Sequence, residues 1–149
     1  MASADANELF SAAVDFAMTM LRQHGEFVPF GVTMSQDGST AMVAADVGSE
    51  HPRSQDVIDL LQASFLSSLR DGSIKAAAVC LDLLVVPPGA AEKSDAVCVR
   101  LVHTRGEELE VFLPYTGTTG AVFSFGQVFA SAAGVFRLSQ PQLFNQEGR

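Results

Sequence analysis

The segment from Ile74 to Val86 is the feature that most constrains the fold of this chain of 149 residues. Alanine, valine and leucine fill both sets of its alternating positions, and Lys75 and Asp82 are its charged residues. Successive side chains of a strand point to opposite faces of a sheet, so this pattern is typical of a strand that is covered on both faces. The segment therefore predicts the central strand of a sheet.

Two other segments have the spacing of amphipathic helices. Residues 5–24 place their apolar side chains on one stripe and end at Gly25, and residues 52–70 do the same before Gly72. Polar residues near a helix start can accept hydrogen bonds from its free amides, and proline suits the first turn. The residues expected to mark the two starts are Ser3, Asp5, Ser49, Pro52 and Ser54.

A first hairpin is expected from residues 27–35 and 39–47, which flank Asp37 and Gly38. Asp-Gly between alternating apolar runs is a strong hairpin signal, because a type I′ turn needs positive φ. A two-residue turn there would place Phe30, Val32 and Met34 opposite Ala45, Val43 and Ala41. Pro29 cannot donate a hydrogen bond to a neighbouring strand, so the first strand is expected to be an edge, or to carry a bulge, near its start.

A second hairpin is expected around Thr104-Arg105-Gly106, read as a three-residue loop with glycine in the left-handed position. Its strands, residues 96–104 and 107–115, would pair Val99 with Val111 and set Arg100 beside Glu110. An even register with the preceding strand would bring Asp82 to the other side of Arg100. The attraction of opposite charges favours that register over the one that pairs Cys80 with Cys98.

These elements predict a single α+β domain over residues 1–138, with a flexible tail over 139–149. The expected architecture is an antiparallel sheet of five or six strands in the order α-β-β-α-β-β-β, with the helices on one face. Residues 121–125 are expected to add a strand, and residues 126–136 favour a short third helix over an irregular return. The order resembles that of profilin-like and roadblock-type modules, which dimerise and hold partners; this is an analogy of fold.

The row formed by Asp82, Arg100 and Glu110 is one candidate site for a ligand or partner. Two carboxylates flanking a guanidinium could form a polar site on an otherwise apolar sheet. A solvated ladder of ion pairs is the alternative, unless a helix covers that face and makes the row a buried network.

Two histidines are further candidates. His51 follows Ser49 and Glu50 just before a helix start, where a site for an anion is possible, but capping of the helix explains the same residues. His103 is expected opposite Glu107, which could raise its pKa, and a contact at the hairpin end is the alternative interpretation.

Composition excludes several classes of function. The net charge is −8 and the nine lysines and arginines are scattered, which disfavours binding to nucleic acid or to anionic membranes. No apolar run has the length of a membrane span, and the first residues lack the pattern of a secretory signal, so a cytoplasmic location is expected. Cys80 and Cys98 are expected to be buried thiols, and no spacing of cysteine and histidine predicts a metal or cofactor site.

Several short motifs resemble those of a family of small, uncharacterised bacterial proteins: Glu26-Phe27-x-Pro29-Phe30-Gly31, His51-Pro52-x-Ser54-Gln55-Asp56, Lys75-Ala76-Ala77-Ala78, Pro87-Pro88-Gly89, Asp95-Ala96 and Pro114-Tyr115. The resemblance covers about residues 5–130. It implies a bacterial, stand-alone, cytosolic protein, and it implies no activity and no site residue.

The sequence therefore favours a non-catalytic module that dimerises or binds a protein partner. Eleven phenylalanines exceed what a small core needs, and some of them could form a contact surface for a second copy. One alternative is a small-molecule binder or enzyme with a polar site on the sheet. Another is an acidic chaperone of a second bacterial protein.

Overall fold

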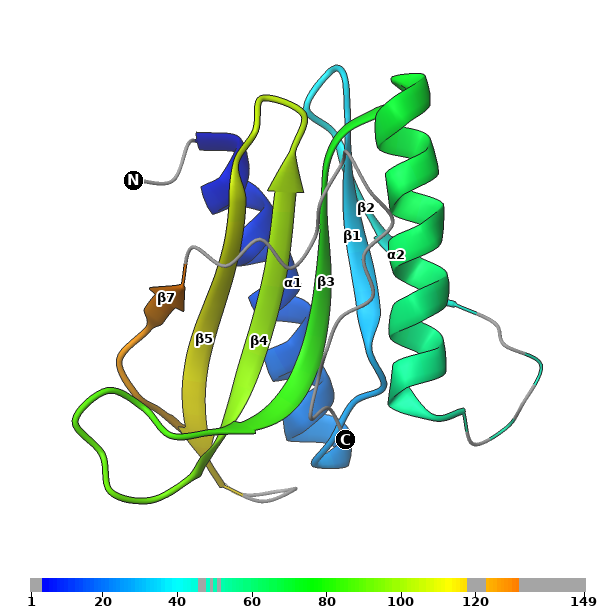
Figure 1. Cartoon of the computed structure of the whole chain (residues 1–149). Helices are drawn as coiled ribbons and strands as arrows, with labels where there is room; N and C mark the ends of the chain where they lie inside the picture. Colours follow the sequence, from blue (N-terminus) through cyan, green and yellow to red (C-terminus); the bar gives the residue numbers. More distant parts are fainter. Residues whose placement is uncertain (1–3, 46–47, 49, 51, 118–122, 132–149) are drawn as a thin grey trace.

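The computed structural model describes residues 4–45, 48, 50, 52–117 and 123–131 (Figure 1). The elements follow the predicted order, and the fold is α+β with an antiparallel sheet. Within the described residues, neither helix combines the length and the hydropathy needed to cross a membrane. The elements are α1 (Ala4–His24), β1 (Phe30–Ser35), β2 (Thr40–Val43), α2 (Ser54–Asp71), β3 (Ile74–Val85), β4 (Ser94–His103), β5 (Glu108–Thr116), β6 (Ser124–Phe125) and β7 (Phe129–Ser131).

The sheet runs in the order β2-β1-β3-β4-β5-β6, and β7 also pairs with β5. Every pair of neighbouring strands is antiparallel. The predicted central strand, β3, lies between β1 and β4, as the apolar pattern of its two faces indicated. β1 pairs with β3 from Phe30 onward but with β2 only from Gly31 onward. Phe30, which follows Pro29, therefore pairs with Cys80 alone.

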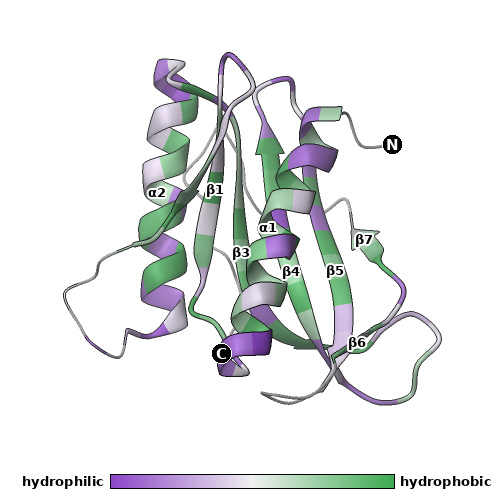
Figure 2. Ribbon diagram, turned by 180° about the vertical axis from the view of Figure 1, so that it is seen from behind, coloured by the Kyte–Doolittle hydropathy of each residue, from purple (hydrophilic) through white to green (hydrophobic). Residues whose placement is uncertain are grey.

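The two helices lie on opposite faces of this sheet, so the prediction that they share one face is wrong. Figure 1 shows α1 behind the strands, and Figure 2, seen from behind, shows it in front of them. The buried stripe of α1 packs with Val32, Ala78 and Val99, whereas that of α2 packs with Ala77 and Val79. Alternate residues of β3 thus enter two separate cores, because a strand that is apolar on both sides needs cover on both.

Both helices end at the glycines that the sequence indicated. Gly25 has a φ of 77° and Gly72 a φ of 82°, the left-handed conformation that closes a helix. The start of α2 differs from the prediction, because Arg53 is the capping residue and its side chain makes no capping hydrogen bond. Ser49, one of the expected caps, lies outside the described residues.

The two hairpins have the same loop type, although the sequence predicted it only for the second. In the β4–β5 hairpin, His103 N–H donates to Glu107 and Gly106 has a φ of 99°, as expected. In the β1–β2 hairpin the Ser35 N–H donates to the carbonyl of Ser39 at 2.8 Å, so the loop holds three residues and not two. The register therefore differs by one from the prediction: Val32 pairs with Met42, and the expected partner Val43 pairs with Gly31.

The third helix that the sequence favoured over residues 126–136 is not found in residues 126–131, the part of that segment that the structure describes. Phe129 belongs to β7, its ring stacks on Phe112 with centroids 4.9 Å apart, and the two residues are partners in the β5–β7 register. Stacking and strand pairing with β5 together outweigh the weak helical spacing of residues 126–136. Of the strand predicted over residues 121–125, the structure describes residues 123–125, and Ser124–Phe125 form the short β6. Residues 132–149, with the predicted tail, lie outside the described residues.

Candidate functional site

The predicted row of Asp82, Arg100 and Glu110 does not form, because the register of β3 and β4 is odd. Asp82 pairs with Val97, and Arg100 pairs with Val79, so the two charged side chains point to opposite faces of the sheet. A shift of one residue exchanges the two faces of a strand, and the apolar pattern opposes such a shift only weakly when both faces are apolar. The small gain from pairing opposite charges does not decide the register.

The other half of the row is confirmed. Arg100 pairs with Glu110, and the Nε atom of Arg100 donates to Oε2 of Glu110 at 2.8 Å. The Arg100 side chain is fully buried and that of Glu110 is 11% exposed, so this is a buried ion pair and not a solvated ladder. The thiol of Cys98 also contacts Glu110, with Sγ 3.8 Å from Oε2, and burial raises the pKa of that thiol. This arrangement joins β4 to β5 and keeps both charges largely away from solvent.

His103 binds a partner that the sequence did not indicate. Its Nε2 atom lies 2.9 Å from Oδ2 of Asp5, a residue 98 positions away in the chain. The backbone N–H of Arg105 donates to Nδ1 at 3.1 Å, so the two ring nitrogens of His103 contact different residues. The expected partner, Glu107, contacts His103 through its backbone carbonyl.

Three basic side chains surround the carboxylate of Asp5. Besides His103, Lys75 Nζ lies 3.2 Å and an Arg105 guanidinium nitrogen 3.1 Å from the same Oδ2 atom. The hydrogen bonds from His103 and then from Lys75 lower the pKa of Asp5 below its ordinary value of 3.8. This cluster ties the start of α1 to β3 and to the β4–β5 hairpin. His51, the remaining predicted site residue, lies outside the described residues.

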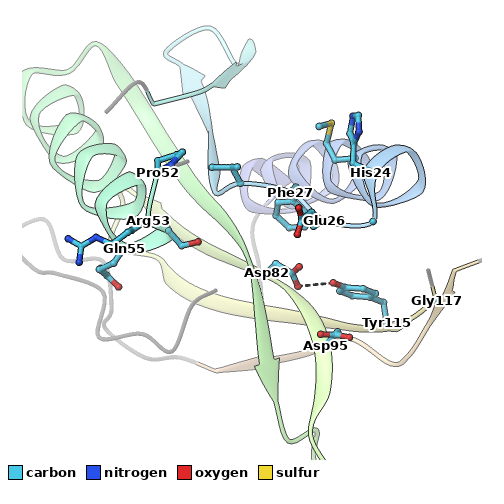
Figure 3. A pocket seen from close by; sticks show the side chains of 14 residues that line it. His24, Glu26, Phe27, Pro52, Arg53, Gln55, Asp82, Asp95, Tyr115 and Gly117 are labelled. Carbon is cyan, nitrogen blue, oxygen red and sulfur yellow. Dashed lines mark hydrogen bonds between the residues drawn. The ribbon is translucent and has the colours of Figure 1, made fainter. Parts of the chain in front are cut away.

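Asp82 lies at the opposite end of the face that α1 covers, and it is 8% exposed. The hydroxyl of Tyr115 donates to its Oδ1 atom at 2.8 Å. Asp95 stands beside this pair, because it is the register partner of Tyr115 on β4. Figure 3 shows the three side chains grouped on the strands, with Glu26 and Phe27 above them on the segment that follows α1.

A cavity of about 890 Å³ opens beside Asp82. Its walls come from the end of α1, the segment between α1 and β1, the start of α2, and strands β3, β4 and β5. A volume of this size is within the range of small-molecule sites, which are usually lined by segments from several parts of a chain. The lining residues are Met20, His24, Gly25, Glu26, Phe27, Val28, Pro52, Arg53, Ser54, Gln55, Asp82, Asp95, Tyr115 and Gly117.

The ionisable side chains of this cavity are mostly acidic. Glu26, Asp82 and Asp95 line it, together with the basic residues Arg53 and His24. The guanidinium of Arg53 is joined to the carboxylate of Asp56 by two hydrogen bonds of 2.9 and 3.0 Å. No three histidine, cysteine, aspartate or glutamate side chains in the described part of the chain are placed to hold one metal ion.

Sequence reasoning singled out Asp82 but missed the residues that accompany it. In the sequence, Glu26, Asp95 and Tyr115 belong to motifs of the resemblance, which implies no site residue. A signal for Asp95 was present. The β4–β5 register, which was predicted correctly, pairs Val97 with Leu113. Two residues farther along, the same register pairs Asp95 with Tyr115. No local signal indicated Glu26, whose place depends on how α1 crosses the sheet.

Comparisons with protein-family models, with curated proteins and with solved structures find no match to this chain. The analogy with profilin-like and roadblock-type modules therefore stays a prediction. The function has to be argued from the geometry of the molecule itself.

Proposed function

We propose that the chain is a non-catalytic binding module that pairs the edge strand β2 with a strand of another protein chain, in the first place a second copy of itself. The observation that carries this proposal is the state of β2. Three of its four residues are exposed, and Met42 is 45% exposed. Thr40, Ala41, Met42 and Val43 include no charge and no proline, the residues with which proteins usually protect an edge.

The hydrogen-bonding groups of this edge are set for pairing. The bond from Ser35 to Ser39 fixes the alternation of the hairpin, so Ala41 and Val43 bond to β1 while the backbone groups of Thr40 and Met42 point outward. Within the described residues, no strand pairs with this outer side of β2. Two copies related by a twofold axis could join these edges as antiparallel strands and form one continuous sheet.

The opposite edge of the sheet supports the same reasoning by contrast. There β5 is paired at one end with β6 and along its middle with β7. Among the described residues, the chain covers this edge with its own strands and pairs no strand with the outer side of β2, which favours an outside partner for β2.

The state of the reactive side chains favours binding over catalysis. Cys80 and Cys98 are buried on opposite faces of the sheet, and burial raises the pKa of both thiols. A protonated thiol is a poor nucleophile. Both ring nitrogens of His103 are engaged, one with Asp5 and the other with Arg105. As the resemblance to a bacterial family implies, we place this activity in the bacterial cytoplasm.

Light scattering coupled to size-exclusion chromatography tests the proposal. The wild type is expected at twice its chain mass of 15.8 kDa. Met42→Pro removes an outward N–H without removing a bond to β1, so this variant is expected to be monomeric. Met42→Ala keeps the N–H and is expected to remain a dimer, which separates strand pairing from contacts of the side chain. A wild type that is monomeric at every concentration, without a bound partner, would contradict the proposal.

The cavity beside Asp82 favours a second candidate function, that of a small-molecule binder. A thermal-shift screen of common metabolites and metal ions tests it, because a ligand at 100 times its Kd adds about 2.7 kcal/mol to stability. A reproducible rise in Tm supports this function. A single protein that co-purifies tightly would instead favour the chaperone alternative.

A further inference from the structure

The edge strand β2 can meet a second copy of itself in several registers, and its side chains favour one of them. We propose that the twofold axis of the dimer passes through Met42, so that this residue lies directly opposite Met42 of the second copy, on the sheet face that α1 covers. The inference rests on the proposed function, the pairing of β2 edges, and names the contacts that the two copies make.

The two faces of β2 follow from its pairing with β1. Met42 pairs with Val32, which packs in the core under α1. Val43 pairs with Gly31, where an added Cβ would collide with the ring of Phe65 on α2. Side chains of directly paired residues lie on the same face of a sheet. Met42 is therefore on the α1 face of β2, and Val43 is on the α2 face.

The outward backbone groups of β2 limit the possible registers. These groups belong to Thr40 and Met42, so a hydrogen-bonded pair across the axis has to join residues of this set. An axis at Thr40 would set Met42 opposite Gly38, which belongs to the hairpin loop. An axis at Val43 would carry most of the pairing past the last residue of the strand. Two registers remain, one with the axis at Ala41 and one with the axis at Met42.

The side chains favour the axis at Met42. In that register Met42 faces its own counterpart and Ala41 faces Val43, so apolar side chains meet on both faces of the sheet. An axis at Ala41 would instead set Met42 opposite Thr40. It would also set Val43 opposite Ser39, so that each of the larger apolar side chains would meet a residue with a hydroxyl group. Because directly opposite side chains contribute most to the pairing of strands, the axis at Met42 gives the more stable dimer.

The approach to β2 is open on both faces of the sheet. Helix α1 packs on β1, β3 and β4, and α2 packs on β1 and β3, so neither helix is centred on β2. Figure 1 shows β2 at the edge of the sheet, outside β1. A twofold axis perpendicular to the sheet would place both copies of α1 on one face of the joined sheet and both copies of α2 on the other. Met42, which is 45% exposed in the single chain, would then be covered by its counterpart.

Disulfide formation by single introduced cysteines tests the register. The native Cys80 and Cys98 are buried and burial raises the pKa of both thiols, so an introduced surface thiol is the reactive one. Residues of a hydrogen-bonded antiparallel pair have Cα atoms about 5.5 Å apart, which fits a disulfide. Under mild oxidation, Met42→Cys is therefore expected to shift from the position of one chain to that of two on a non-reducing gel.

Two neighbouring positions and one remote position are the controls. With the axis at Met42, the two copies of residue 41 have Cα atoms about 8 Å apart and those of residue 40 about 14 Å apart, too far for a disulfide. Ala41→Cys and Thr40→Cys are thus expected to stay at the position of one chain. Leu84→Cys controls for random collisions, because Leu84 is 43% exposed near the end of β3 and away from β2. It is also expected to stay at the position of one chain.

Light scattering on the reduced samples separates this inference from the proposed function. If the samples are dimeric and Ala41→Cys or Thr40→Cys cross-links in place of Met42→Cys, the inference is overturned while the proposed function stands. If Leu84→Cys cross-links as fully as Met42→Cys, the cross-links report collisions and the inference is overturned as well. If the samples are dimeric and no variant cross-links, the copies join through another surface, which contradicts both. If wild type and all variants are monomeric, the proposed function fails and the inference fails with it.

Discussion

The sheet face that α1 covers has a buried or half-buried carboxyl group at each end, and the two have different surroundings. At the start of α1, Asp5 lies within 3.2 Å of Lys75, His103 and Arg105. At the other end, Asp82 accepts a hydrogen bond from the neutral hydroxyl of Tyr115 and faces a cavity with further acids. One carboxylate is shared by three basic side chains, whereas the other accepts a hydrogen bond from a hydroxyl at the edge of a cavity.

This difference separates a structural contact from a candidate site. The Asp5 cluster joins elements that are distant in sequence, so its removal should change stability and little else. The Asp82 cavity is lined by residues of several elements, so changes in its lining should alter stability less than the loss of a buried ion pair does.

The largest effect is expected at a third carboxyl group, Glu110, because its basic partner Arg100 is fully buried. Glu110→Ala would leave the fully buried Arg100 without this partner, and removing one member of a buried ion pair costs about 3–5 kcal/mol. Chemical denaturation measures this loss. The double variant Arg100→Met with Glu110→Leu is the control and should recover most of the stability. If Glu110→Ala is as stable as the wild type, the ion pair does not contribute to stability.

A smaller effect is expected for Asp5→Asn, which removes the charge that Lys75, His103 and Arg105 share. The expected fall in Tm at pH 7 is about 2–4 °C. Because the pKa of Asp5 is lowered in the folded state, its stabilising effect is present above the ordinary value of 3.8 and is lost as the pH falls through the folded-state value. The difference in Tm between wild type and variant should therefore disappear in acid.

The acid dependence has to be measured as that difference. Asp37 and Asp71 also have lowered pKa values, through hydrogen bonds from Ser39 and Ser73, so the wild type loses stability in acid for several reasons. Comparison at each pH with Asp5→Asn cancels those contributions. A difference in Tm that stays constant from pH 7 to low pH would contradict the assigned role of the Asp5 charge.

The smallest effect is expected for Tyr115→Phe, which removes the hydroxyl beside Asp82 and keeps the ring. Loss of one hydrogen bond should lower the free energy of unfolding by about 0.5–1.5 kcal/mol. Denaturation with urea measures it, and a loss as large as that of Glu110→Ala would mean that the Asp82 end is structural after all.

The sequence predicted those parts of the fold that depend on local signals. Gly25 and Gly72 end the helices, and Gly106 sets the hairpin that places Arg100 beside Glu110. The β1–β2 register was missed by one residue, because Asp37-Gly38 fits a two-residue turn as well as the three-residue loop that forms.

The site was less predictable, because it depends on contacts between distant segments. Asp82 lies on a strand that is apolar on both faces, so the sequence did not determine which neighbour it would meet. The contact of Asp5 with His103 joins positions 98 residues apart, and neither residue carries a local sign of it. The apolar residues on both faces of β3 already indicated that helices cover both faces of the sheet. The expectation that both helices share one face did not agree with this pattern.

The proposed pairing of β2 edges is tested most directly by the mass in solution of wild type, Met42→Pro and Met42→Ala, measured by light scattering at several concentrations. Wild type and Met42→Ala should have twice the chain mass of 15.8 kDa. Met42→Pro should have the mass of one chain. A wild type that is monomeric at every concentration without a bound partner, or a Met42→Pro variant that stays dimeric, would contradict the account.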